Sequence, residues 1–284
     1  MSDKTASNDS PKFSASLKRS ERITPESSPE EVRNLVFTTT DLSFQPKPGQ
    51  CIRVFAPGQY GNRYHNRYYS LADLNEKSDN QTEFSLCVRR CSYIDEFNGE
   101  ECKGIASNYL CDLKPGDQIQ FNGPFGHPFT LPTNKKADLL MLSIGTGIAP
   151  FRGFIRSIYE EHGGWQGKVR LFHGAKTGFE MLYMNDENHD LANYYDQKTF
   201  KAFQAVSPRP AMEAPIALDK AIEKNGSDVL AMLLSTNTMV FLSGPKALAE
   251  TADKALARLL GGEKQWKALK QELIETNRWN TVLY

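Results

Sequence analysis

Short runs of β-forming residues, broken at Gly, Pro and Asn, fill the chain from about Val32 to Leu131. Runs of strand length occupy residues 32–39, 50–56, 67–72, 83–90 and 117–124. Residues 105–113 have the apolar spacing of one short helix, with Ser107 as the expected N-cap residue. Many short strands with a single helix predict a closed antiparallel β-barrel.

The pattern changes in the second half of the chain. Apolar runs at 137–144, 168–175, 200–207 and 238–245 alternate with segments of helical spacing at about 150–162, 179–193, 216–233, 246–260 and 264–276. This alternation predicts an α/β domain with a parallel sheet and helices on both faces. We expect the two domains to be residues 31–134 and 135–284, meeting near Thr133–Lys136.

The first 30 residues are rich in Ser and poor in large apolar side chains. Such a segment buries too little surface to offset its ordering entropy, so we expect residues 1–30 to be a flexible tail. It lacks the apolar stretch of a secretory signal, and four acids argue against a transit peptide: Asp3, Asp9, Glu21 and Glu26. These features favour a cytoplasmic protein.

Composition narrows the possible partners. The chain has 34 Lys and Arg against 34 Asp and Glu, so its formal net charge is zero. We therefore expect no general binding to nucleic acid, and the lack of any run of about 18 apolar residues predicts no membrane insertion. The five cysteines form no CxxC pair and no metal-binding pattern with the five histidines. Reduced thiols and no metal site are expected.

Four loops follow the predicted parallel strands. The first, Gly145-Thr146-Gly147-Ile148-Ala149-Pro150, precedes a helix, so its glycines would let the backbone approach a pyrophosphate at a helix N-terminus. Alone, this motif is equally consistent with a structural turn. The other three loops carry Gly174, Ala175 and Lys176; Ser207 and Arg209; and Ser243 and Gly244. Because carboxyl ends of parallel strands share one edge, the four loops together predict a nucleotide site.

In the barrel half, the run Arg67-Tyr68-Tyr69-Ser70 combines a cation, aromatic rings and a hydroxyl. A flavin needs this set: Arg for the pyrophosphate, Tyr for the ring, and a hydroxyl at the reactive N5 edge. Four residues alone are also consistent with an ordinary amphipathic strand.

Longer strings occur along the chain in a fixed order: EVRNLVF, RYYSLA, SLCVRR, KGIASNYLCDLKPGD, GPFG, GTGIAPFR, LFHGAKT and a terminal RWNTVLY. In this order they resemble the plant-type ferredoxin–NADP+ reductase family from Val32 to Tyr284. The resemblance implies a six-stranded FAD-binding barrel followed by an α/β domain that binds NADP(H).

The resemblance also implies roles for individual residues. In the barrel, Arg67 would contact the FAD pyrophosphate, Tyr69 would stack on the flavin and Ser70 would lie near N5. The other FAD-binding positions are Tyr68, Cys87, Val88, Arg89, Tyr93, Gly104, Ile105, Ala106 and Ser107. The terminal Tyr284 would cover the opposite face of the flavin. On the nicotinamide side the implied positions are Gly145, Thr146, Gly147, Pro150, Gly174, Ala175, Lys176 and Gly244, with Ser207 and Arg209 for the 2′-phosphate.

Some positions depart from the family pattern. Pro208 separates Ser207 from Arg209, and the tyrosine that usually covers the NADP adenine has no clear counterpart, so NAD(H) stays an alternative to NADP(H). Ser243 replaces a family Cys, and Val282 replaces a Glu. Since hydride transfer depends on a near-attack geometry, we expect slow hydride exchange. The catalytic positions that the resemblance implies are Ser70, Ser243 and Tyr284.

The implied activity is hydride exchange between FAD and NADP(H) and single-electron exchange with ferredoxin or flavodoxin. Arg63, Arg89, Arg90 and Lys103 are candidate docking residues for such an acidic partner. One alternative is an NAD(P)H-dependent reductase component of an oxygenase or another metalloprotein. Another is a flavin-binding sensory or scaffold protein without turnover. A monomer or weak dimer is expected.

Overall fold

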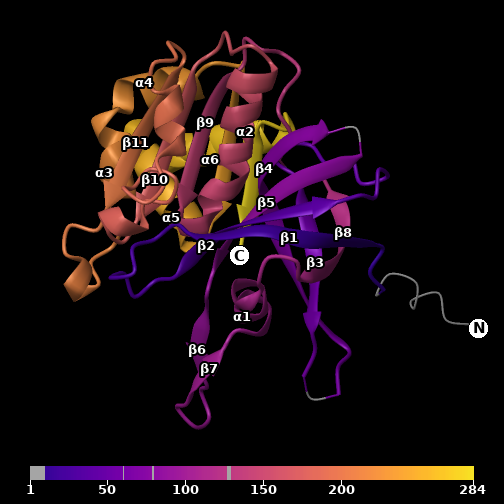
Figure 1. Cartoon of the computed structure of the whole chain (residues 1–284). Coiled ribbons are helices and arrows are strands. Elements are labelled where there is room, and N and C mark those ends of the chain that lie inside the picture. Colours follow the sequence, from indigo (N-terminus) through magenta and orange to yellow (C-terminus); the bar gives the residue numbers. More distant parts are fainter. Residues whose placement is uncertain (1–9, 60, 79, 127–128) are drawn as a thin grey trace, which may run out of the picture.

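A computed structural model describes residues 10–59, 61–78, 80–126 and 129–284 (Figure 1). Within these ranges, six antiparallel strands close into a barrel in the order β1-β2-β5-β4-β3-β8. Their bounds are Phe13–Arg22 (β1), Val32–Thr39 (β2), Cys51–Pro57 (β3), Tyr64–Ser78 (β4), Gln81–Arg89 (β5) and Gln118–Phe125 (β8). Buried aromatic rings fill the interior, among them Phe37, Phe84 and Phe121. The predicted antiparallel barrel is confirmed.

The predicted flexible tail is wrong for the strand β1. Residues 16–22 pair with β2 and residues 13–16 pair with β8, so this strand closes the barrel. Ala15 and Leu17 point inward and are almost fully buried, while alternate residues are polar. Pairing on both sides overrides the polar composition, because the strand needs only one apolar face. Residues 1–9 of the predicted tail lie outside the described residues.

The second domain is a parallel sheet in the order β11-β10-β9-β12-β13. Its strands are Asp138–Ile144 (β9), Val169–Ala175 (β10), Phe200–Val206 (β11), Thr238–Gly244 (β12) and Trp279–Leu283 (β13). Helix α2 (Ala149–Arg156) packs on the face toward the barrel. The opposite face is covered by α3 (Leu218–Lys224), α4 (Gly226–Leu233), α5 (Ala247–Leu259) and α6 (Glu263–Glu275). The predicted parallel sheet with helices on both faces is confirmed.

The helix predicted at 179–193 does not form. Two short 3₁₀ turns, Gly178–Glu180 and Asp190–Tyr194, flank an irregular segment. Asn185 explains part of this difference, because its side chain donates to the carbonyls of Ile23 and Phe179 and accepts from two following backbone amides. Such side-chain bonds to the backbone compete with helix formation.

The two domains share one core. Val32, Ala72 and Cys87 of the barrel pack in the same buried cluster as residues of α2 and the sheet. In Figure 1, α2 lies between the sheet and strand β4. On the other side of the barrel, α1 (Ile105–Asp112) and the hairpin of β6 (Ser92–Ile94) and β7 (Glu101–Lys103) project from the body. The last barrel strand ends at Phe125 and β9 begins at Asp138, on either side of the predicted domain boundary.

Candidate functional site

The loop after β9 is shaped by close backbone contacts. Gly145 has φ +56°, a left-handed conformation that glycine adopts without strain. A Cβ atom on Gly147 would lie 2.0 Å from the carbonyl oxygen of Ser243, so only glycine lets the end of β12 press against this loop. Pro150 is buried in the first turn of α2. Amides in this turn have no partner within the helix, and Pro150 lacks an N–H group, so it adds no unpaired donor.

The other loops end at the same edge of the sheet, as predicted. Gly174 and Ala175 are buried at the end of β10, and Lys176 is exposed. Ser207 is also buried, and its hydroxyl donates to the carbonyl of Ala214 at 2.6 Å. Arg209 is exposed, and its guanidinium has no hydrogen-bond or ion-pair partner among the described residues. Its charge is therefore available to an anion, whereas the proton of the Ser207 hydroxyl is already used.

The barrel side of the site lies on β4. Alternation places Arg67 and Tyr69 on one face of the strand and Tyr68 on the other, and the half-buried Ser70 follows Tyr69 directly. Tyr68 is 60% exposed and packs edge-on against Phe125. Burial raises the pKa of Tyr69, with smaller contributions from the neighbouring thiols of Cys111 and Cys91. The half-buried phenol beside an exposed guanidinium is an arrangement that suits a ring attached to a pyrophosphate.

The start of α1 differs from the prediction. Gly104, not Ser107, is the N-cap residue, and it makes no side-chain cap. Ser107 lies within the helix, where its hydroxyl accepts from the amide of Cys91 and donates to the carbonyl of Gly104. The side-chain amide of Asn108 donates to the backbone carbonyls of Cys91 and Gly104, each at 2.8 Å. These bonds fix the helix start, including Ile105 and Ala106, beside the end of β5.

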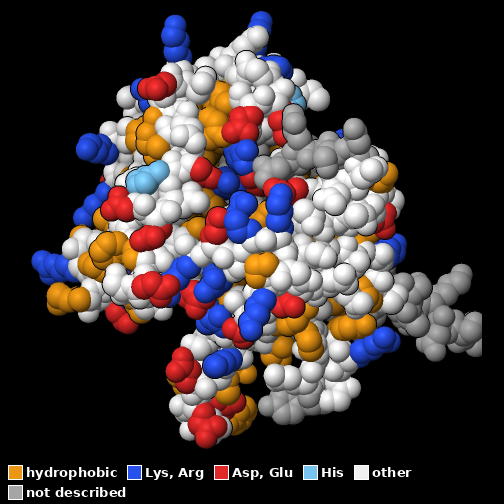
Figure 2. All heavy atoms as spheres, in the orientation of Figure 1, with side chains coloured by type: hydrophobic (Ala, Val, Ile, Leu, Met, Phe, Trp, Pro, Cys, Tyr) orange, Lys and Arg blue, Asp and Glu red, His pale blue; other side chains and the backbone are white. Residues whose placement is uncertain are grey.

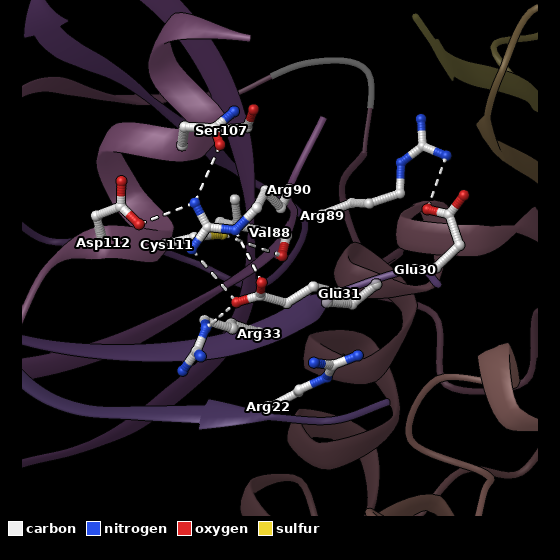
Figure 3. Close-up of polar contacts among 12 residues, drawn as sticks. Arg22, Glu30, Glu31, Arg33, Val88, Arg89, Arg90, Ser107, Cys111 and Asp112 are labelled. Atoms are coloured by element: carbon white, nitrogen blue, oxygen red, sulfur yellow. Dashed lines mark hydrogen bonds and ion pairs between the residues drawn. The ribbon is translucent and has the colours of Figure 1, made fainter. Parts of the chain in front are cut away.

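Two neighbouring arginines at the end of β5 have different surroundings (Figure 3). Arg90 donates to Glu31 at 2.8 Å and to Asn108 at 3.0 Å, and it forms an ion pair with Asp112. Arg89 points away from this cluster, and its ion pair with Glu30 is long, at 3.4 Å. Arg90 is therefore a structural tie between β5, α1 and the loop before β2, while Arg89 retains capacity for a phosphate.

The remaining predicted residues of this strand are distributed over several environments. Cys87 and Val88 are buried, and burial raises the pKa of the Cys87 thiol to about 12. Tyr93, on the projecting hairpin, is 57% exposed. Its ring is thus accessible to a planar ligand such as adenine.

The terminal residue is held at three points. The hydroxyl of Tyr284 shares a 2.7 Å hydrogen bond with that of Thr146, in the loop after β9. Its amide donates to Gly244, and its carbonyl accepts from Lys246. Burial raises the pKa of the phenol, and the thiols of Cys87 and Cys91 contribute. Since Cys91 also affects Tyr69, both predicted phenols lie near the same point of the barrel.

The sequence analysis singled out Ser243 but not the row of buried polar side chains to which it belongs. His173, Ser143 and Ser243 are in register on three adjacent strands, and all three are almost fully buried. His173 Nδ1 and the Ser143 hydroxyl lie 2.8 Å apart, and burial lowers the pKa of the imidazole to about 3. The sequence signal for these residues is a polar side chain at the same level in each of three largely apolar strands.

Among the described residues, no group of three or more His, Cys, Asp and Glu side chains could hold a metal ion. No helix formed by those residues is both long enough and apolar enough to cross a membrane.

Comparison with known proteins defines the class. Residues 15–129 match the oxidoreductase FAD-binding domain family, and residues 141–254 match the oxidoreductase NAD-binding domain family. The first range covers nearly all of the barrel, and the second covers most of the parallel sheet but not β13. The fold and the site therefore define a two-domain flavoprotein oxidoreductase that binds FAD and a nicotinamide dinucleotide.

Individual relatives define the family. The leaf isozyme 1 of chloroplastic ferredoxin–NADP reductase from Arabidopsis thaliana is 32% identical over 93% of this chain and 74% of its own length. The cyanelle enzyme of Cyanophora paradoxa is 31% identical over the same shares. The solved ferredoxin–NADP+ reductase of Plasmodium falciparum aligns over 96% of both chains with TM-score 0.73 at 18% identity. The chain belongs to the ferredoxin–NADP reductase family.

Proposed function

We propose that this protein exchanges hydride between NADP(H) and bound FAD and exchanges single electrons with a ferredoxin or flavodoxin. FAD supplies the chemistry that converts two-electron into one-electron transfer. The observation that carries the proposal is the bond between Tyr284 and Thr146. It joins the last residue of the chain to the nucleotide loop at the point where both approach the barrel. A nicotinamide held by that loop would reach the barrel there.

The residues present fit these two ligands. Arg67, Arg89 and the uncapped start of α1 would hold the FAD phosphates, and Tyr93 would cover the adenine. Tyr69 and Tyr284 would face the two sides of the flavin ring, with Ser70 at its N5 edge. On the other domain, the close contact at Gly147 and the free guanidinium of Arg209 would receive the dinucleotide and its 2′-phosphate.

The partner would dock where the flavin edge is accessible. Of the proposed docking residues, Arg90 is engaged in ion pairs, whereas Lys103 is exposed and Arg63 lies 5.0 Å over the Tyr64 ring. On the face shown in Figure 2, basic and acidic side chains intermix across the middle of the molecule instead of forming one large patch. Docking would therefore rest on Arg63 and Lys103, with a modest dependence on salt. A monomer or weak dimer suits this arrangement.

All five cysteines are free in the structure. This supports a reducing compartment, and we propose the cytoplasm, although the named relatives are chloroplast and cyanelle proteins.

Hydride exchange should be slow relative to family members with Cys and Glu at the two altered positions. Ser243 is buried behind Gly147, and Val282 packs against the shared core. Neither side chain carries a charge that could act on the nicotinamide. We expect Val282→Glu to raise the limiting rate of flavin reduction by NADPH several-fold in stopped-flow measurements. Val240→Thr, in the buried part of β12, is the control and should leave the rate unchanged. An unchanged rate in Val282→Glu would contradict this account.

Anaerobic titration of the purified protein with NADPH and with NADH, in parallel, tests the proposed function. We expect NADPH to bleach the flavin absorbance at lower concentration than NADH, because Arg209 is available to the 2′-phosphate. Subsequent addition of oxidised ferredoxin should restore the absorbance. A flavin that neither nucleotide reduces would refute the proposal, and equal responses would refute only the NADP(H) preference.

A further inference from the structure

Arg152 crosses the boundary between the two domains. It belongs to α2 and is 6% exposed. One guanidinium nitrogen donates to the carbonyl of Ala72 at 3.1 Å and lies 3.1 Å from the carboxylate of Asp73, and both of these residues are on the barrel strand β4. Another nitrogen donates to Asp190 of the sheet domain at 2.6 Å. The buried side chain of Arg152 therefore joins the helix that follows the nucleotide loop to the flavin barrel, next to an ion pair between Arg156 of the same helix and Asp73.

The same guanidinium lies against a strained aromatic residue. Its central carbon is 4.7 Å from the ring centroid of Tyr183, which is fully buried. Tyr183 has φ +59°, a left-handed conformation that bulky side chains rarely adopt and that persists only where the surroundings impose it. Its hydroxyl donates to Asn34 of barrel strand β2 at 3.0 Å. Arg152 and Tyr183 thus form two adjacent links across the same boundary.

These links extend toward the terminal phenol. The thiol of Cys87 lies close enough to Tyr183 and to Tyr284 to affect the pKa of both phenols. Neighbouring side chains therefore lead from β4 through Arg152, Tyr183 and Cys87 toward the residue that is hydrogen-bonded to Thr146. This path connects the junction of the domains to the place where the nicotinamide would approach the flavin.

We propose that Arg152 is a positioning residue for hydride transfer. It holds Tyr183 and Cys87 under the reaction site and fixes the orientation of the nucleotide domain against the barrel. The inference rests on the proposed function, because the orientation matters only if the two domains bring a nicotinamide and a flavin together. Near-attack geometry is sensitive to small displacements, so loss of this link should reduce the rate of transfer more than the affinity for the nucleotide.

Arg170 provides a matched control. It is also 6% exposed, and it pairs with Asp228 at 2.5 Å and donates to the carbonyl of Thr199 at 2.8 Å. All of these partners belong to the sheet domain. The two arginines therefore have similar burial and similar ion pairs, but only Arg152 contacts the barrel in the described structure.

The experiment compares Arg152→Met, Arg170→Met and Tyr183→Phe in the FAD-loaded full chain. We expect Arg152→Met to lower the limiting rate of flavin reduction by NADPH by about tenfold to a hundredfold. It should also weaken the charge-transfer absorbance, while the dissociation constant of NADP+ changes by less than about threefold. Hydrogen–deuterium exchange should rise at residues 82–88 and 181–185, on both sides of the boundary. Arg170→Met should lose thermal stability, keep the rate within about twofold of the wild type and raise exchange only within the sheet domain.

Tyr183→Phe keeps the ring under the guanidinium and removes the bond to Asn34, so it tests the link if Arg152→Met does not fold. Tyr183→Phe should also lower the limiting rate of flavin reduction by NADPH, but by a smaller factor than Arg152→Met. Equal rates and equal charge-transfer absorbance in the wild type and these variants would overturn the inference. A wild-type flavin that NADPH fails to reduce would instead refute the proposed function, and the exchange pattern would still decide whether Arg152 couples the domains.

Discussion

At the scale of single residues, His173 shows how the sheet limits the conditions under which the protein is stable. The imidazole is fully buried, and its Nε2 has no partner among the described residues. Burial lowers its pKa to about 3, so the folded protein keeps it neutral while the unfolded chain protonates it below its ordinary pKa of about 6.5. The unfolded state then binds the extra proton, and stability is lost as the pH falls from about 6.5 toward 3.

We therefore expect His173→Leu to flatten the acid limb of the stability profile. The wild type should lose up to about 1.4 kcal/mol per pH unit more than the variant between pH 6 and pH 4. Urea unfolding at a series of pH values measures this difference. His189→Leu, at an exposed position outside the sheet, is the control and should follow the wild type. Parallel profiles for His173→Leu and the wild type would show that this side chain does not limit acid stability.

Gly147 is the residue whose contacts most constrain the nucleotide loop. A methyl group there would clash with the carbonyl of Ser243, so Gly147→Ala should cost about 1–3 kcal/mol of unfolding free energy and weaken NADP+ binding. Gly178→Ala is the control, because a Cβ at that position has open space around it. Denaturant unfolding and NADP+ titration measure the two effects. Wild-type affinity in Gly147→Ala would contradict the close packing described for this loop.

At the scale of elements, β1 makes the largest difference between sequence and structure. Leu17 is 1% exposed in the barrel core, so Leu17→Ala should lower the unfolding free energy by about 2–5 kcal/mol. Arg19→Ala, at a half-exposed position in the same strand, should cost less than about 1 kcal/mol. Chemical denaturation of both variants measures these changes in unfolding free energy. Equal, small effects would restore the prediction of a flexible tail.

Most elements could be predicted from the sequence, because their apolar residues repeat with a clear period. Barrel strands such as β5 and sheet strands such as β9 carry this signal within themselves. The strands β1 and β13 were missed because their stability comes from neighbouring strands rather than from their own composition. The segment 179–193 was misassigned because Asn185 and the left-handed Tyr183 stop a helix that its apolar spacing favours.

The site shows the same division. Its glycine-rich loops and the candidate residues Arg67 and Tyr284 lie in short strings that resemble the family, so they could be proposed from the sequence. Arg152 could not, since its partners Asp73 and Asp190 are distant in sequence and only the packed domains bring them together. The distinction between Arg89 and Arg90 likewise depends on Glu30 and Glu31, which the fold places beside them.

At the scale of the whole molecule, the two domains behave as one body around a shared core. The account requires that the barrel hold FAD between a phenol of β4 and the phenol that ends the chain. In Figure 1 the C-terminus lies in the middle of the molecule, and Cys87 of the barrel strand β5 lies close enough to Tyr284 to affect the pKa of its phenol. If Tyr284 covers the flavin as proposed, its substitution should affect catalysis more than folding.

Absorption spectroscopy of the purified, FAD-reconstituted full chain tests this claim most directly. The account predicts a yellow protein that releases about one equivalent of FAD on denaturation, consistent with a single preformed cofactor site. Its flavin fluorescence should be quenched while the protein is folded, because both ring faces would contact the phenols of Tyr69 and Tyr284. A folded, colourless protein that does not retain added FAD would contradict the account.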